Sequence, residues 1–196
     1  MSKPAKIIDA ARKRFRYYGI QKTTMQEIAQ DAGVAVGTLY LYFGNKDELV
    51  VACADKFVEH HREQLATVLA ASGTAEEKLR SYIVARFRMS QEIRTSSRHA
   101  AEIARAVLRV KPDRIEEEGQ MMWQAVVQIL KRGIDDRAFN IESPEDDAKV
   151  FLYSIAWFFP NALSKVSTAP SEEDLLLVVN WFINAWKGPA TKTRKR

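Results

Sequence analysis

The stretch that decides the fold is TTMQEIAQDAGVAVGTLYLYFGNK, residues 23–46. Counted from Met25, apolar side chains stand at the fourth, eighth, tenth and fifteenth positions, namely Ile28, Ala32, Val34 and Leu39. Ala29 is small where two helices must cross closely, and Gly33 stands where a sharp turn needs a positive φ. This spacing predicts a helix that ends at Gly33 and a second helix that begins at about Val36, which together form a helix-turn-helix.

Helix-start signals flank this unit on both sides. Thr24 and Glu27 have the spacing of a capping box, in which the hydroxyl accepts from the Glu27 amide and the carboxylate accepts from the Thr24 amide. Asn45 and Glu48 repeat the arrangement at the next helix. These limits leave a short helix over 36–43 whose inner face consists of Leu39 and Phe43.

The outer face of the 36–43 helix predicts a contact with duplex DNA. It offers small residues at its leading end and two phenols further along: Val36, Gly37, Thr38, Tyr40 and Tyr42. Small side chains let a helix lie close to base edges in the major groove, and phenols can hydrogen-bond phosphates at the groove walls. Residues 1–50 carry eight Lys and Arg against five Asp and Glu, a net charge of +3 that suits a polyanionic partner.

The segment GTLYLYFGNKDEL, which follows TTMQEIAQDAGV, resembles the DNA-binding head of the TetR/AcrR family of transcriptional regulators, and the resemblance covers residues 4–64. It implies phosphate contacts from Thr24 and Lys46. It also implies base and backbone contacts from the outer face of the 36–43 helix, where Val36, Gly37 and Thr38 face bases and Tyr40 and Tyr42 reach the backbone and flanking bases. The chain departs from many family members at Leu41, where they have an aromatic residue, and at Gly44, where they have a basic or polar one.

Helix signals dominate the rest of the chain, so the predicted fold class is all-α. Pro and Gly stand at boundaries, and no Val, Ile or Thr run alternates with a period of two. We expect nine helices, over about 4–18, 25–32, 36–43, 46–71, 74–92, 97–111, 112–135, 144–160 (kinked at Pro160) and 171–187. The expected domains are a helix-turn-helix head over 4–64, a ligand-binding and dimerisation body over 65–187, and a flexible basic tail over 188–196, and the resemblance implies the same architecture.

The last two expected helices are apolar on more than one face, which predicts a homodimer. A helix that is apolar all round must be buried, and little of the chain remains to cover these two. We expect them to pair with their copies as a four-helix bundle, as the resemblance also implies, through Phe151, Ile155, Phe159, Leu175, Val178, Val179 and Phe182. A dimer would present two reading helices to a palindromic operator. The alternative that these are ordinary core helices stays open.

The body is rich in aromatic and Met residues, which line small-molecule pockets in helical bundles but more often form plain core. The resemblance implies a small-molecule effector that releases the DNA. The candidate ligand-binding residues are Tyr82, Phe87, His99, Met122, Trp123, Tyr153, Trp157 and Asn161.

Other classes of protein find little support in the sequence. The single cysteine, Cys53, allows no disulfide within the chain and fits the reducing cytoplasm. No signal peptide is evident, and the apolar run over 151–160 is too short to span a bilayer. His60 and His61 are adjacent, so they point about 100° apart on a helix and cannot chelate one ion together. Because no catalytic constellation exists, we expect neither an enzyme nor a cofactor.

These observations predict a cytoplasmic, dimeric, DNA-binding transcriptional regulator. The favoured mechanism is a repressor that a small apolar or aromatic ligand releases from a palindromic operator. The alternative is an architectural protein or an activator on the same scaffold, without a small-molecule effector.

Overall fold

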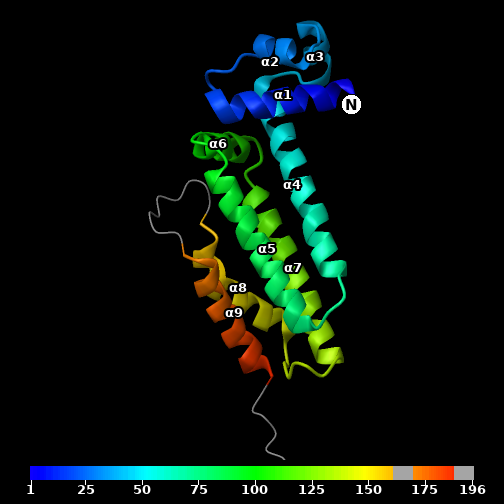
Figure 1. Cartoon of the computed structure of the whole chain (residues 1–196), viewed down its shortest axis with the longest axis vertical. Helices are drawn as coiled ribbons and strands as arrows, with labels where there is room; N and C mark the ends of the chain where they lie inside the picture. The colour runs from blue at the N-terminus through cyan, green and yellow to red at the C-terminus, as the bar shows by residue number, and fades with distance from the viewer. Residues whose placement is uncertain (161–169, 188–196) are drawn as a thin grey trace, which may run out of the picture. The chain divides into compact units, whose positions relative to one another are not determined.

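The computed structural model describes residues 1–160 and 170–187. Over these residues the chain forms nine α-helices and one 3₁₀ turn, with no strand, which confirms the all-α class (Figure 1). The elements are α1 (Lys3–Tyr18), α2 (Met25–Ala32), α3 (Val36–Tyr42), α4 (Lys46–Ala70), α5 (Ala75–Thr95), α6 (Ala100–Val110), α7 (Arg114–Asp135), α8 (Pro144–Ile155), the turn η1 (Ala156–Phe158) and α9 (Glu172–Trp186).

The chain folds into two compact units. The described residues of the N-terminal unit are 1–64 and 89–115, and those of the C-terminal unit are 65–88, 116–160 and 170–187. The boundaries fall inside α4, α5 and α7, so these three helices each contribute to both units. The predicted residues Asn161 and the tail 188–196 lie outside the described part of the chain.

The head of the N-terminal unit consists of α1, α2 and α3 packed at the beginning of α4 (Figure 1). Its core contains Ile28, Ala32 and Leu39, as the sequence pattern predicted, together with apolar residues of α1 and of the first turns of α4. Ile7, Phe15, Ile28, Leu39 and Leu49 each have 2% or less of their surface exposed. Burial of aliphatic and aromatic side chains on this scale is the main stabilising contribution to a small helical domain.

The turn between α2 and α3 has the geometry that a glycine makes easy. Gly33 adopts the left-handed conformation, with φ 65° and ψ 39°. The Gly33 amide donates to the Gln30 carbonyl at 3.1 Å, and the Val34 amide donates to the Ala29 carbonyl at 3.0 Å. This pair of bonds is a Schellman motif, which ends a helix sharply and satisfies its last carbonyls. The predicted stop at Gly33 is therefore confirmed in detail.

Three predicted helix limits are wrong. α8 ends at Ile155 and passes into η1, so no helix reaches Pro160 and no kink forms there. A proline disfavours the helical conformation in the residue before it, and Phe159 has a ψ of 55°, so no helix continues through Pro160. At the other two limits, α5 continues to Thr95 and α6 begins only at Ala100, because Ser96 and Ser97 bond to other parts of the N-terminal unit instead of capping α6.

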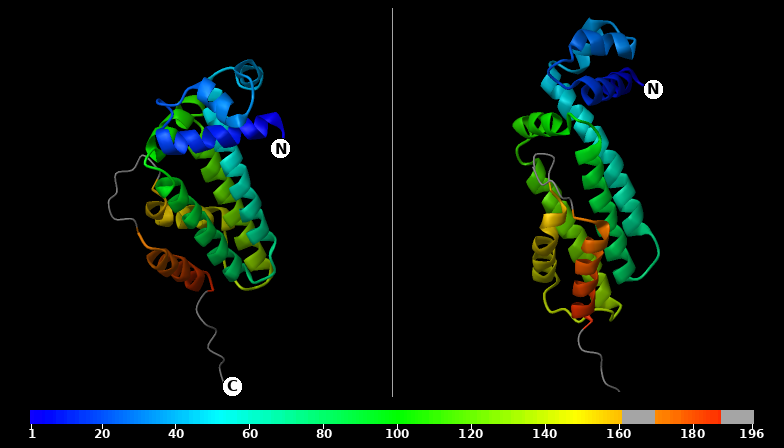
Figure 2. Two further views of the ribbon diagram at one scale, coloured as in Figure 1. Left: turned by 45° about the horizontal axis from the view of Figure 1, so that its top comes forward. Right: turned by 60° about the vertical axis from the view of Figure 1, so that its left-hand side comes forward.

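In the C-terminal unit, α8 and α9 lie side by side (Figure 2). Phe151 and Ile155 of α8, and Leu175, Val179 and Ile183 of α9, are fully buried. No helix in the described residues combines the length and the apolar character needed to cross a bilayer.

Candidate nucleic-acid interface

Helix α3 packs one side against the core of the head and exposes most of its other residues to solvent. Leu39 is its one fully buried residue, and Phe43, which ends the helix, is 9% exposed. On the opposite side Tyr40 is 49% exposed, Leu41 85% and Tyr42 48%. A Cβ added to Gly37 would meet nothing within 4 Å. Within its unit, α3 therefore presents a rigid, solvent-facing surface.

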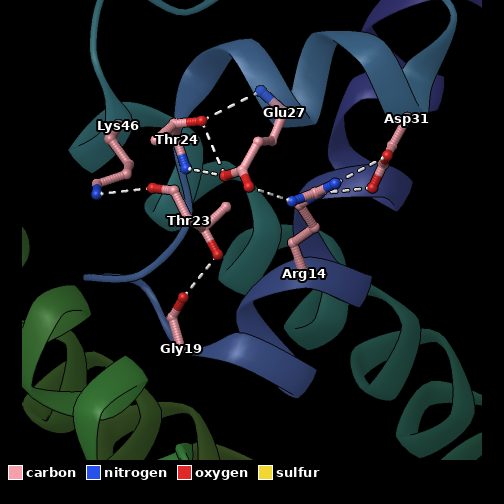
Figure 3. Close-up of polar contacts among 7 residues, drawn as sticks. All are labelled: Arg14, Gly19, Thr23, Thr24, Glu27, Asp31 and Lys46. Carbon is pink, nitrogen blue, oxygen red and sulfur yellow. Dashed lines mark hydrogen bonds and ion pairs between the residues drawn. The ribbon is translucent and has the colours of Figure 1, made fainter.

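The start of α2 is fixed by the predicted capping box (Figure 3). The Thr24 amide donates to Glu27 Oε2 at 2.8 Å, and the Glu27 amide donates to Thr24 Oγ1 at 3.2 Å. Hydrogen bonds from the amide and hydroxyl of Thr24 lower the pKa of the Glu27 carboxyl. Since the Thr24 hydroxyl also donates to Glu27 Oε2 at 2.8 Å, it can donate to a phosphate only by leaving that carboxylate. The phosphate contact of Thr24 stays a prediction.

Arg14 joins α1 to both ends of α2 (Figure 3). Its Nε donates to Asp31 Oδ2 at 2.6 Å and its Nη2 to Asp31 Oδ1 at 3.0 Å, while Nη1 lies 2.9 Å from Glu27 Oε1. The hydrogen bonds from Arg14 lower the pKa of Asp31. In the sequence this arginine counted only as basic charge, because a partner 17 residues away carries no local signal. Arg14 is a brace within the head.

Lys46 ties the first turn of α4 to the loop between α1 and α2. Its Nζ donates to the carbonyl oxygens of Ile20 at 2.8 Å and Thr23 at 3.0 Å. Thr23 is itself buried and donates its hydroxyl to the Gly19 carbonyl at 2.7 Å. An ammonium group has three N–H donors, so one remains for the predicted phosphate contact. Lys46 has a structural role that the sequence did not reveal.

The cap of α4 differs from the predicted box by one residue. The Glu48 amide donates to Asn45 Oδ1 at 2.9 Å, as expected, but the Glu48 carboxylate accepts from the Gly44 amide, also at 2.9 Å. A Cβ on Gly44 would lie 3.3 Å from that carboxylate. Gly44, where the chain departs from many family members, thus takes part in the cap of α4 through its amide.

A set of contacts that the sequence did not predict holds α1 to the α5–α6 region of the same unit. Arg16 Nε donates to the Ser96 carbonyl at 2.7 Å, and Ser97 Oγ donates to the Arg16 carbonyl at 2.5 Å. The Gln21 amide donates to Glu102 Oε1 at 2.9 Å. We call Arg16, Gln21, Ser96, Ser97 and Glu102 the α1 clamp. Partners about 80 residues apart leave no pattern in the sequence.

Gly19 has no Cβ, which leaves room for the side chains of the α1 clamp. It has a φ of 84°, and an added Cβ would lie 2.6 Å from Glu102 Oε2 and 2.8 Å from His99 Nδ1. His99, a predicted ligand residue, lies 3.2 Å from Glu102 through the same Nδ1. His99 therefore lies next to the α1 clamp.

The other candidate ligand residues lie in the C-terminal unit or outside the described residues. Tyr82, Phe87 and Met122 are buried, and Trp123 Nε1 donates to the Glu145 carbonyl at 3.2 Å. Tyr153 and Trp157, by contrast, are 72% and 63% exposed. Their roles in ligand binding stay predictions, and Asn161 falls outside the described residues.

Most of the predicted dimer residues are already used inside the subunit. Phe151, Ile155, Leu175 and Val179 have no exposed surface, so a second chain cannot reach them. Phe159, Val178 and Phe182 are half-buried. The apolar residues of α8, η1 and α9 that do face outward are Val150, Tyr153, Trp157, Leu177 and Trp181, which we call the outer apolar face. Consecutive apolar residues do not show which side of a helix meets the core, and the dimer contacts of all seven residues stay a prediction.

Comparison with known proteins agrees with this geometry. The model of the family "Bacterial regulatory proteins, tetR family" matches residues 7–53. The transcriptional regulator TtgR of Pseudomonas putida is 46% identical over 57 residues, which are 29% of this chain and 27% of TtgR. The transcriptional repressor KstR2 of Mycobacterium tuberculosis is 22% identical over 163 residues, 80% of this chain and 78% of KstR2. In the first curated relatives, the match spans only 27–38% of the relative's length.

Solved structures match over nearly the whole chain. A transcriptional regulator from Cytophaga hutchinsonii has a TM-score of 0.74 at 22% identity, covering 92% of this chain and 96% of that one. SmeT in complex with triclosan has a TM-score of 0.64 at 17% identity, covering 94% and 91%. These structures share the fold, and the family model covers the helix-turn-helix. Residues 7–53 therefore belong to the tetR family of bacterial regulatory proteins, and the chain as a whole has the fold of TetR/AcrR-family regulators.

Proposed function

We propose that the chain acts as a homodimeric repressor that binds a palindromic operator through α3 and leaves it when a small molecule binds. The observation that carries this proposal is the presentation of α3, which Leu39 holds from below while its opposite face stays open. A helix in the major groove needs this combination, because positional precision and close approach both depend on a rigid support.

The basic residues of the head fall into two groups. Arg14, Arg16 and Lys46 bond to other parts of the head or clamp, and Lys13 pairs with Asp9 at 2.9 Å. Lys3, Lys6, Arg12 and Lys22 are exposed and have no ion-pair partner among the described residues. We assign the phosphate contacts chiefly to this second group, so the salt dependence of binding should reflect about four or five phosphates per subunit.

The outer apolar face supports the proposed dimer. Val150, Tyr153 and Trp157 are spaced by three and four residues, as are Leu177 and Trp181 by four, so each set follows one side of its segment. Monomeric proteins rarely expose apolar patches of this kind. A second copy of the chain, paired through α8 and α9 as a four-helix bundle, would cover them.

Sedimentation tests the dimer. We expect a dimer at micromolar concentration for the wild type and a monomer for the double variant Leu177→Glu, Trp181→Glu. Ile115→Glu is the matched control, because Ile115 is an exposed apolar residue of the N-terminal unit, 56% exposed, and should leave the dimer intact. A monomeric wild type would contradict the proposed assembly.

The repressor and effector parts of the proposal draw on the relatives. KstR2 is named a repressor, and SmeT has been crystallised with triclosan, a small aromatic molecule. In this chain the buried Tyr82, Phe87 and Met122 supply apolar surface of the kind that lines such sites.

A selection of genomic fragments with purified protein tests the whole proposal. We expect an enriched inverted repeat whose half-sites lie about one helical turn of DNA apart, or a multiple of it. Enrichment without any repeated motif would instead favour an architectural DNA-binding role, and the absence of DNA binding would refute the proposal.

A further inference from the structure

The four arginines of α5 differ in their partners. Arg80 Nε donates to Asn180 at 2.7 Å, Arg86 lies 3.1 Å from Glu118, and Arg88 makes two bonds to Glu172 at 2.7 and 2.8 Å. Arg94, in the last turn, has no partner among the described residues, and its Nε is buried. The Nε of a guanidinium that is always charged is therefore buried without an acceptor, in a side chain that is half-buried as a whole.

Gln91 repeats the anomaly one turn earlier on the same face of α5. Its Nε2 is likewise buried and makes no hydrogen bond in the described part of the chain. Native structures leave few buried polar atoms unsatisfied, and each such atom costs free energy because it has lost its water. Two unsatisfied donors, one of them on a charged group, therefore lie three residues apart on α5.

The neighbouring carboxylates of the N-terminal unit are directed elsewhere. Glu92 Oε2 lies 3.7 Å from His61 Nε2, and the Glu92 side chain is 61% exposed. Glu102 accepts from Gln21 and contacts His99 within the α1 clamp. Neither of these two carboxylates forms a hydrogen bond or ion pair with Gln91 or Arg94 in the described part of the chain.

We propose that Gln91 and Arg94 form the binding site for an anionic oxygen group, the carboxylate of a small-molecule effector. A guanidinium and a carboxylate match in charge and geometry, and a side-chain amide adds a neutral donor beside them. Both side chains are long and only half-buried, so rotation about their own bonds can turn the donors towards an entering group. This inference rests on the proposed function, because it names the chemistry of the effector.

The position of the site connects it to the head. Arg94 precedes Ser96 and Ser97 by two and three residues, and these serines hold Arg16 of α1 through the α1 clamp. A bound carboxylate that moves Arg94 would therefore also move the short segment that contains Ser96 and Ser97. The site and the clamp both lie in the N-terminal unit, so this coupling uses contacts within one compact body.

The test uses two substitutions that remove the unsatisfied donors, Arg94→Met and Gln91→Leu, with Arg88→Met as the matched control on the same helix. The probes are hexanoate, decanoate and benzoate, each beside its alcohol (hexan-1-ol, decan-1-ol, benzyl alcohol), together with inorganic phosphate. Thermal unfolding and the anisotropy of a labelled operator duplex are both recorded for each protein and probe.

We expect a carboxylate to raise the unfolding midpoint and weaken operator binding of the wild type, with the matching alcohol at least tenfold less potent. Arg94→Met should reduce the affinity for that carboxylate about tenfold to a hundredfold, while Arg88→Met leaves it unchanged. In the absence of probe, Arg94→Met and Gln91→Leu should raise the unfolding midpoint, because each removes an unsatisfied buried donor. A purely structural role for these side chains predicts a lower midpoint.

Three results would overturn the inference: no Arg94-dependent response to any carboxylate, an equal response to the alcohols, or a response to phosphate as large as that to the acids. The probe-free titration separates this failure from a failure of the proposed function. If the wild type binds its operator and only the carboxylate response is missing, the proposed regulatory function is retained and the proposed carboxylate site is refuted. If the wild type binds no operator, the proposed function itself fails.

Discussion

Helices α3 and α9 show two different ways in which this chain offers a surface to a partner. α3 is a seven-residue helix held by one fully buried side chain, and its open face mixes Thr and Tyr hydroxyls and small residues with the exposed side chain of Leu41. α9 is fifteen residues long, has four buried residues, and still leaves Leu177 and Trp181 each 66% exposed. A mixed, shallow face suits a hydrated duplex, whereas an apolar face suits another protein. Exposure alone therefore does not identify a partner, whereas the chemistry of the exposed face indicates its class.

The supports of these two helices differ as well. α2 and α3 are positioned by polar contacts at specific residues, such as the capping box of Thr24 and the brace of Arg14. α8 and α9 are positioned by apolar packing around Phe151, whose ring lies 5.2 Å from that of Phe182 and 5.5 Å from that of Trp186. Substitutions in the two regions should therefore fail in different ways.

The largest effect should come from the packed region. Phe151→Ala should lower the free energy of unfolding by about 3–5 kcal/mol, because it removes a fully buried ring and leaves a cavity. Urea denaturation at several protein concentrations measures this loss and separates it from subunit dissociation. Trp181→Ala is the control: it should weaken the dimer more than it destabilises the fold. Equal losses of fold stability from both variants would contradict the division between core and outer apolar face.

The second prediction compares two glycines of the N-terminal unit. Gly19→Ala should cost about 1–3 kcal/mol, because it strains a positive φ and forces Glu102 of the α1 clamp to move. Gly37→Ala has free space and a helical backbone, so it should stabilise the head by about 0.5–1 kcal/mol. Thermal unfolding measures both changes. If Gly37 allows close approach to bases, its substitution should also weaken operator binding, a loss of function without a loss of stability.

The third prediction separates the two roles of Lys46. Lys46→Met should cost about 1–2 kcal/mol of stability, because it removes two charge-assisted bonds to backbone carbonyls. It should also reduce the slope of operator affinity against salt by about one if the third N–H binds a phosphate. Lys22→Met is the control, because Lys22 is exposed and should affect only the salt slope. An unchanged unfolding midpoint in Lys46→Met would refute the structural role.

The smallest expected effect is a response of α2 to acid. Folding lowers the pKa of Glu27 below its ordinary 4.5 and that of Asp31 below 3.8. A carboxyl whose pKa is lower in the folded state stabilises the fold above its ordinary pKa, and this contribution is lost as the pH falls through the folded value. Amide hydrogen exchange in α2 should therefore accelerate below about pH 4 relative to α1. Glu27→Gln should flatten that dependence, and an α2 equally protected at pH 3 and pH 6 would count against it.

The same contrast explains what the sequence could and could not predict. Thr24, Gly33 and Leu39 act through neighbours within a few residues, so their spacing was enough to place the cap, the turn and the anchor of α3. The brace from Arg14 to Asp31 and the α1 clamp join residues 17 to about 80 positions apart, and only the folded chain brings them together. In α9 the apolar residues are nearly continuous, so the period that would separate inward from outward positions is missing, and Leu175 and Leu177 could not be told apart.

We expect the exposed residues of α3 to determine which bases are recognised, and the pairing of two subunits to determine the inverted symmetry of the operator. The most direct test is to repeat the genomic selection with Val36→Ser and with Thr38→Ala and to compare the enriched motifs with that of the wild type. We expect altered base preference inside each half-site, with the spacing and the inverted symmetry unchanged. A motif identical to the wild-type motif in both variants would show that α3 does not read the bases, and would contradict the account.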